Sequence, residues 1–170
     1  MTKIIDMEAV LISVPAEGNA FTETNSEDML VVLITDEDGN VGFGECHAAP
    51  PVVKAMVDYR TEHFWAHGII DHVIGADPIE ARALYDRITN ASSYHGRTGI
   101  HINALSAVDM ALYDLTGKQL KKPVWQLLGG AVQDAARPYA TIYVGDTRGE
   151  PTKIILDSMA KIVETIKGFG

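Results

Sequence analysis

The opening part of the chain alternates short apolar runs with turn residues, a pattern that predicts strands. Residues 3–14 mix apolar and polar positions as in a half-buried strand, and residues 29–35 form a β-branched run typical of a strand buried on both faces. Asp38 and Gly39 form a strong hairpin-turn signal, so residues 41–48 should return beside the second strand. These three strands predict a small antiparallel sheet.

Helical spacing follows from residue 50 onward. Residues 50–75 open with two prolines, which suit a first helical turn, and residues 77–92 begin with Asp77 in the position of an N-cap. Residues 100–122 carry the longest helical pattern, and residues 123–130 form a short turn that closes on two glycines. We therefore expect a helix bundle packed against the sheet.

The last part of the chain changes to one strand followed by one helix. The strand is expected at residues 138–144 and the helix at residues 151–167. The helix places six apolar residues on one face, namely Ile154, Ile155, Met159, Ile162, Val163 and Ile166. One such unit cannot close a parallel sheet, so it should be the first repeat of something larger. The predicted fold class is α+β, with a first domain over residues 1–130 and a second over residues 131–170.

Composition changes this picture mainly by excluding partners. The 170 residues hold 14 Lys and Arg against 23 Asp and Glu, a formal charge of −9, which disfavours nucleic acid as a partner. No segment approaches the ~20 apolar residues of a membrane span, so no membrane partner is expected. The single cysteine, Cys46, cannot form an internal disulfide, and this fits a cytoplasmic location.

Two features of the strand and helix patterns predict close packing rather than chemistry. Gly42 and Gly44 fall two apart on one face of a strand, so a neighbouring element should approach closely there. Asp109 and Asp114 are five apart on the long helix and diverge by ~140°, so they cannot easily share one small site. We expect each carboxylate to satisfy buried backbone or a basic neighbour.

The histidines and the cysteine give weak signals for a site. His63 and His67 have the spacing of metal ligands on one helix face, but no third ligand is evident, so a structural role is favoured. Cys46 lacks a partner constellation for a nucleophile. A structural role is also expected for the scattered histidines His72, His95 and His101.

Three motifs together resemble a known family. They are "SAVDMALYDLTGKQLKKPVWQLLGG" at residues 106–130, "DEDGNVGFGE" at residues 36–45 and "GADP" at residues 75–78. Taken in their order along the chain, they resemble the mandelate racemase and muconate-lactonizing branch of the enolase superfamily. The resemblance implies that residues 1–130 form an N-terminal capping domain and that residues 131–170 are the first strand and helix of a (β/α)7β barrel.

The resemblance also implies a reaction. Such enzymes remove a proton beside a carboxylate and stabilise the enediolate on Mg²⁺. The family's metal ligands and bases lie on later barrel strands, so no catalytic or metal residue can be placed here. Magnesium is expected in the intact enzyme and not on this chain alone, which should be inactive.

The resemblance further suggests a substrate class. Residues 94–115 look most like the sugar-acid dehydratases, which implies a small hydroxy-acid substrate and a dehydratase or racemase reaction. Muconate cycloisomerases and dipeptide epimerases of the same superfamily are alternatives. A different alternative is a non-catalytic α+β module that acts through protein contacts.

Two loops should shape the substrate pocket if the resemblance holds. They are residues 15–28 and residues 46–52, and the second contains His47. The other candidate pocket residues are Phe21, Thr22, Thr24 and Tyr143. A homo-oligomer is also expected, because a lone strand and an exposed apolar helix face promote association.

Overall fold

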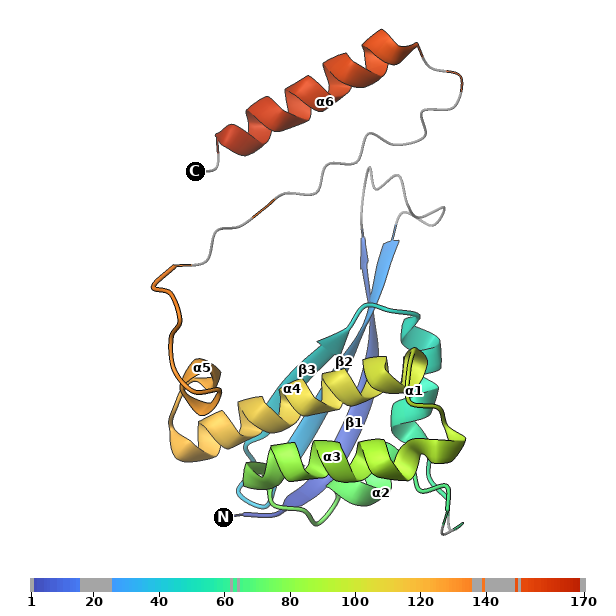
Figure 1. The fold of residues 1–170 in the computed structure, drawn as a ribbon, viewed down its shortest axis with the longest axis vertical. Helices are drawn as coiled ribbons and strands as arrows, with labels where there is room; N and C mark the ends of the chain where they lie inside the picture. The colour runs from blue at the N-terminus through green and yellow to red at the C-terminus, as the bar shows by residue number, and fades with distance from the viewer. Residues whose placement is uncertain are drawn as a thin grey trace. The chain divides into compact units, whose positions relative to one another are not determined.

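The structure is a computed structural model and describes most of the chain in two compact units (Figure 1). The described residues are 2–15, 26–61, 63, 65–135, 139, 149 and 151–168. The first unit comprises Met1–Ser13 and Asp28–Ala131, and the second comprises Val14–Glu27 and Val132–Gly170.

A three-stranded antiparallel sheet opens the fold, as predicted. Its strands are β1 (Ile4–Pro15), β2 (Ser26–Asp36) and β3 (Val41–Cys46), in the spatial order β1-β2-β3. The β2–β3 pairing runs in register from Leu30 opposite Cys46 to Thr35 opposite Val41. The α+β fold class is therefore confirmed.

The strand bounds differ from the prediction at the first connection. β1 and β2 both continue into the expected loop over residues 15–28, and β3 ends at Cys46 rather than at residue 48. Strands are held by backbone hydrogen bonds, which do not require apolar side chains. The prediction used the side-chain pattern alone and therefore misplaced the strand ends by one to three residues.

The turn between β2 and β3 is closed by its own backbone. The Asp36 N–H donates to the Asn40 carbonyl at 3.0 Å, and the Gly39 N–H donates to the Asp36 carbonyl at 3.0 Å. Gly39 has φ of 80°, in the left-handed region that glycine adopts without steric cost. The Asp-Gly signal thus predicted the hairpin correctly.

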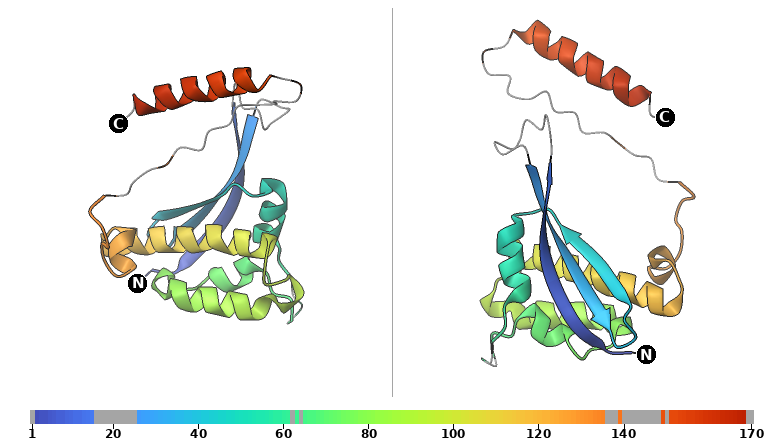
Figure 2. Two further views of the ribbon diagram at one scale, coloured as in Figure 1. Left: turned by 45° about the horizontal axis from the view of Figure 1, so that its top comes forward. Right: turned by 180° about the vertical axis from the view of Figure 1, so that it is seen from behind.

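Helices cover one face of this sheet (Figure 1). In chain order they are α1 (Pro50–Asp58), α2 (Ile69–Val73), the 3₁₀ turn η1 (Pro78–Glu80), α3 (Ala81–Ala91), the 3₁₀ turn η2 (Ser92–Tyr94), α4 (Ile100–Leu120) and α5 (Val124–Leu127). Seen from behind, the other face of the sheet carries none of the described helices of this unit (Figure 2). The core therefore lies between the sheet and one helical layer.

α4 is the central helix of that layer and packs on β3 through two glycines. A Cβ added to Gly44 would collide with the carbonyl oxygen of Ala107, and one added to Gly42 would lie 2.7 Å from Cβ of Leu115. No residue larger than glycine fits at this distance between strand and helix. The close approach predicted for Gly42 and Gly44 is confirmed.

The helical stretch expected over residues 50–75 is interrupted in the structure. α1 ends at Asp58, α2 begins at Ile69, and the described residues between them are not helical. The backbone at Gly68 passes so close to the Tyr59 carbonyl that a Cβ would overlap it, and the Asp71 carboxylate accepts the Gly68 N–H at 2.8 Å. These contacts hold the chain in a turn and begin a new helix.

The next helix begins as predicted from the Asp77 cap. The Asp77 carboxylate accepts the Ile79 N–H at 3.1 Å, and Pro78 occupies the first position. The first turn, however, is 3₁₀ before α3 continues as an α-helix. Such turns are common at helix starts.

The second unit contains helix α6 (Thr152–Lys167), close to the predicted bounds. None of its 16 residues is buried. Apart from Tyr139, the strand expected at residues 138–144 lies outside the described residues, so the assignment of residues 131–170 to a barrel stays a prediction. Across the described part of the chain, no helix is both long and apolar enough to span a bilayer.

Candidate functional site

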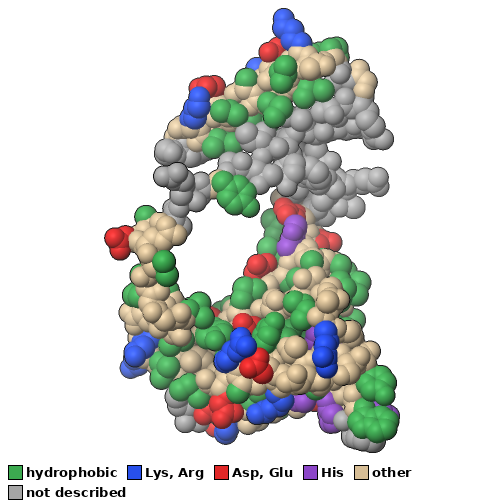
Figure 3. Space-filling view, viewed as in Figure 1, with side chains coloured by type: hydrophobic (Ala, Val, Ile, Leu, Met, Phe, Trp, Pro, Cys, Tyr) green, Lys and Arg blue, Asp and Glu red, His purple; other side chains and the backbone are tan. Residues whose placement is uncertain are grey.

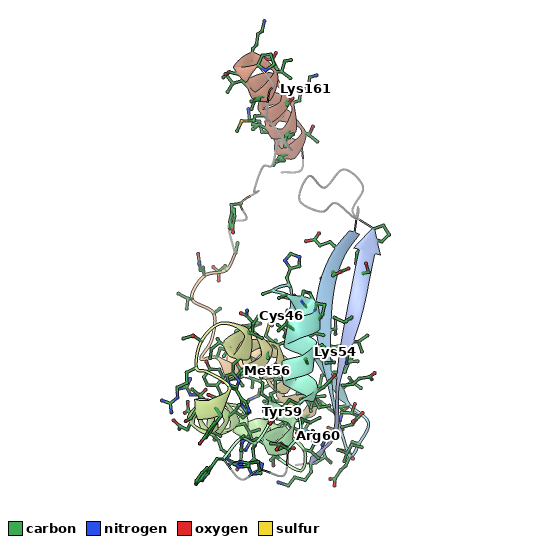
Figure 4. All side chains as sticks on the ribbon, turned by 90° about the vertical axis from the view of Figure 1, so that its right-hand side faces the viewer. Cys46, Lys54, Met56, Tyr59, Arg60 and Lys161 are labelled. Atoms are coloured by element: carbon green, nitrogen blue, oxygen red, sulfur yellow. The ribbon has the colours of Figure 1, made fainter. Side chains whose placement is uncertain are left out.

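The connection from β3 to α1 holds the only candidate pocket residue that the described structure contains, His47. Cys46, at the end of β3, is buried, and its Sγ lies 3.7 Å from the Ala48 carbonyl oxygen. His47 is exposed and has contacts with its surroundings. Pro50 is buried at the first position of α1. Figure 4 shows Cys46 at one end of α1 and Tyr59 at the other.

The backbone of this connection is tightly constrained. Ala49 has φ of 43°, an uncommon left-handed conformation for a residue with a Cβ. Its carbonyl accepts the N–H groups of Val52 at 2.9 Å and Val53 at 3.1 Å, in the first turn of α1. Such conformations cost about 1–3 kcal/mol and persist only where the surroundings impose them. The fold therefore fixes the place from which His47 projects.

The remaining candidate pocket residues are not tested by the structure. Phe21, Thr22, Thr24 and Tyr143 all lie outside the described residues. The loop expected at residues 46–52 is shorter than predicted, because α1 already begins at Pro50. Of the predicted pocket residues, the described part of the chain thus contains His47 alone.

Asp114 has the backbone-binding role expected of it. Its Oδ2 accepts the Phe43 N–H at 2.8 Å and the Lys118 ammonium at 2.7 Å. Lys118 Nζ also donates to the Val41 carbonyl at 2.6 Å and lies 4.4 Å from the centroid of the Phe43 ring. Both side chains thereby cover the open edge of β3, which would otherwise offer unpaired groups to another strand.

The opposite edge of the sheet is covered in the same way, which the sequence did not reveal. Lys54 Nζ donates to the Ala9 carbonyl of β1 at 2.5 Å and pairs with Asp58 at 2.7 Å (Figure 4). Near the start of β1, the Gly75 N–H donates to the Ile4 carbonyl at 2.8 Å. In the sequence, the only signal for these contacts was the spacing of Lys54 and Asp58, four residues apart on a helix, which favours an ion pair between them.

Asp36 is a buried carboxylate that sequence reasoning missed. Burial raises its pKa, but hydrogen bonds from Asn40, Gln119 and Thr2 outweigh that effect and hold the pKa at about 2. The Asn40 and Gln119 side-chain amides donate at 2.9 and 2.8 Å, and the Thr2 hydroxyl donates at 3.1 Å. These hydrogen bonds tie the β2–β3 hairpin to α4 through Gln119 and to the start of the chain through Thr2.

Asp109 is half-buried on α4, and its burial raises the pKa of the carboxyl, with the Arg82 guanidinium opposing that effect. Within the described ranges, no three His, Cys, Asp or Glu side chains lie together in a way that could hold a metal ion. The described residues therefore do not fit a magnesium site, and we derive no catalytic step through a metal.

The hollows on the described surface of the first unit include two that are lined by polar and aromatic side chains. One of about 550 Å³ is lined by Thr2, Asp38, Asn40, Lys118, Gln119 and Lys121. Another of about 280 Å³ is lined by Trp65, His67, Asn90, Ala91, Ser93 and Tyr94. His47 lines neither, so neither hollow coincides with the predicted substrate pocket.

A three-stranded antiparallel sheet followed by a helical layer on one face defines the class of enolase-like N-terminal domains. The sequence agrees with this class, because residues 4–129 match the model of the mandelate racemase / muconate lactonizing enzyme N-terminal domain. The chain belongs to this family.

Two curated relatives are sugar-acid dehydratases. The chain is 43% identical over 112 residues to the L-rhamnonate dehydratase of Saccharopolyspora erythraea. This matched segment covers 66% of the chain and 26% of the relative. The chain is also 36% identical over 142 residues to the D-galactonate dehydratase of Klebsiella pneumoniae. That segment covers 84% of the chain and 32% of the dehydratase. The chain thus spans about a third or less of the relatives' lengths.

Solved structures agree with this assignment. In the crystal structure of a candidate racemase, the protein is 35% identical in sequence to this chain. The two structures match with a TM-score of 0.82 over 98% of this chain and 41% of the racemase chain. A racemase from Streptomyces coelicolor A3(2) with bound magnesium is 27% identical, with a TM-score of 0.62 over 75% of this chain and 36% of that one.

Proposed function

We propose that this chain forms the capping part of a magnesium-dependent enzyme that dehydrates or racemises a small sugar acid, and that it has no such activity alone. The observation that carries this proposal is the similarity to two sugar-acid dehydratases, at 43% and 36% identity. The intact protein would be a cytoplasmic homo-oligomer that binds neither nucleic acid nor a membrane.

In this proposal His47 contacts the substrate from the β3–α1 connection. An imidazole can donate and accept hydrogen bonds, which suits the hydroxyl groups of a sugar acid. The strained Ala49 backbone supports the proposal, since such geometry is concentrated at functional sites. The other pocket contacts would come from Phe21, Thr22, Thr24 and Tyr143.

Magnesium in this proposal belongs to the intact enzyme. The related racemase with bound magnesium supports the choice of metal. The described residues offer no cluster of metal-ligating side chains, so the ion would be held by other parts of the protein. The capping part would contribute substrate contacts and exclude water from the pocket.

A chimera tests the proposal. Residues 4–129 of this chain replace the matched N-terminal segment of the Klebsiella D-galactonate dehydratase, and turnover is measured with D-galactonate and L-rhamnonate in the presence of Mg²⁺. We expect Mg²⁺-dependent loss of water from at least one acid. A folded chimera that turns over neither acid would count against the capping role.

The same chimera tests His47. His47→Ala should raise KM roughly tenfold, the effect of losing about one hydrogen bond to the substrate. His63→Ala is the matched control, because His63 is also exposed and lies outside the β3–α1 connection. If both variants keep the parent KM for both acids, His47 does not contact the substrate.

A further inference from the structure

Four histidines gather in two pairs where the helices of the first unit are joined. The rings of His95 and His101 are stacked with centroids 6.1 Å apart, and those of His67 and His72 are tilted with centroids 5.8 Å apart. The Tyr59 ring meets His95 edge-on at 5.1 Å. Figure 3 shows histidine side chains close together along the lower edge of this unit. We call these four residues the histidine cluster.

The ring nitrogens of the cluster have few hydrogen-bond partners. His101 is 1% exposed, and within the described structure neither of its ring nitrogens has a partner. The same holds for the buried Nε2 atoms of His72 and His95. A proton added to such a nitrogen creates a buried charge with no acceptor, which is strongly unfavourable.

The charges around the cluster oppose protonation further. Burial lowers the pKa of His101, and the neighbouring His95 lowers it more. Burial also lowers the pKa of His72, with His67 and Arg87 of α3 acting in the same direction and Asp71 opposing them. Asp71 lies 4.0 Å from His67, so one of the two pairs has a carboxylate beside it.

We propose that the histidine cluster makes the helical layer acid-sensitive, so that protonation opens the connections at residues 59–68 and 92–99 while the packing of α4 on β3 stays intact. His67 and His95 lie on these connections, while His72 lies in α2 and His101 in the first turn of α4, next to them. Away from the cluster, Gly42 and Gly44 of β3 pack on Ala107, Ala111 and Leu115 of α4, and none of these five residues titrates. Opening would release the end of α1 at Tyr59, opposite the β3–α1 connection.

The direction of the pH effect follows from proton linkage. The folded-state pKa of His72 and of His101 lies below the ordinary value of 6.5, so the opened state binds protons first as the pH falls. Protection of the connections is complete above about pH 6.5 and declines below it. Each histidine that stays neutral until opening raises the opening constant about tenfold per pH unit.

Amide hydrogen exchange of the full chain, corrected for the intrinsic pH dependence of exchange, tests the proposal. Between pH 6.5 and 5.5 the opening constant of residues 59–68 and 92–99 should rise at least tenfold, while that of residues 107–115 stays within about twofold. His101→Phe keeps an aromatic ring and removes the titrating group. The opening constant of this variant should therefore rise about tenfold less per pH unit than that of the parent. His63→Gln, at an exposed position, should keep the parent slope.

A second measurement covers the case in which His101→Phe does not fold. NMR of the imidazole rings in the unmodified chain should show His101 and His72 titrating with a pKa below the ordinary value of 6.5, while the chain is still folded. A folded protein with either ring fully protonated at pH 6 contradicts the proposal. Equal slopes in the parent and a folded His101→Phe variant also overturn it.

Discussion

Helices α4 and α6 have similar lengths and many apolar residues but opposite environments. α4 buries ten of its residues and packs on β3, α1 and α3, whereas none of the residues of α6 is buried. Leu112 of α4 is 1% exposed, and Leu156 of α6 is 59% exposed. Most helical stability in proteins comes from packing an apolar face against other elements. The first unit thus has a core of its own, while the apolar residues of α6 are not buried against other described elements.

The largest expected difference between the two helices comes from matched leucine truncations. Leu112→Ala should lower the free energy of unfolding by about 2–5 kcal/mol, because it leaves a cavity in the core. Leu156→Ala should change it by less than about 0.5 kcal/mol, as at other exposed sites. Urea denaturation is followed by tryptophan fluorescence for the first unit, which contains Trp65, Trp125 and Leu112, and by circular dichroism for all helices, including α6 with Leu156. Equal losses in the two variants would contradict the comparison.

The next largest effect tests the contact between α4 and β3. Gly44→Ala should destabilise the first unit by about 3 kcal/mol, because the new methyl group meets the Ala107 carbonyl of α4 and the backbone must shift. Glu45→Ala, on the exposed face of the same strand, is the control and should cost less than about 0.5 kcal/mol. If Gly44→Ala is as stable as the control, the close approach of helix and strand is wrong.

A smaller effect depends on pH. Asp36→Asn should cost roughly 2 kcal/mol at pH 7, since the pKa of Asp36 is lowered from 3.8 to about 2 by hydrogen bonds that the charged form receives. A lowered pKa stabilises the fold above pH 3.8 and loses that effect as the pH falls toward 2. The difference in free energy of unfolding between the parent and Asp36→Asn, measured by urea titration, should therefore become smaller from about pH 5 to about pH 2. A constant gap, or a similar loss in the exposed control Asp38→Asn, would argue against this role.

The smallest effect concerns the covered edge of β3. Asp114→Ala should cost about 1 kcal/mol, because the Phe43 N–H loses its acceptor and Lys118 loses its partner. Asp86→Ala, which breaks the exposed pair with Arg82, should cost less than about 0.5 kcal/mol. Sedimentation velocity should also show more self-association for Asp114→Ala. Identical sedimentation of both variants at high concentration would mean that Asp114 does not protect this edge.

The parts of the fold that could be predicted depend on local signals. The Asp38-Gly39 turn defined the hairpin, the spacing of Gly42 and Gly44 predicted a close neighbour, and the pattern over residues 100–122 matches α4 within two residues. Each signal lies within a few residues of the feature that it predicts.

The missed features depend on contacts between distant residues. The break between α1 and α2 comes from Gly68 packing on the Tyr59 carbonyl, and the Asp36 network needs Thr2 and Gln119, which are 34 and 83 residues away. For the candidate site, the sequence indicated His47 only through the family resemblance. A single histidine has no periodicity or spacing from which its partners could be predicted.

Our proposal is that this chain forms a folded capping domain and that the catalytic groups belong to other parts of the intact enzyme. Its most direct test is an assay of the purified 170-residue protein with L-rhamnonate and D-galactonate in the presence of Mg²⁺. We predict no turnover above a blank without protein, while circular dichroism shows a folded protein. Turnover that is reproduced with independently purified protein and abolished by a chelator would contradict the claim.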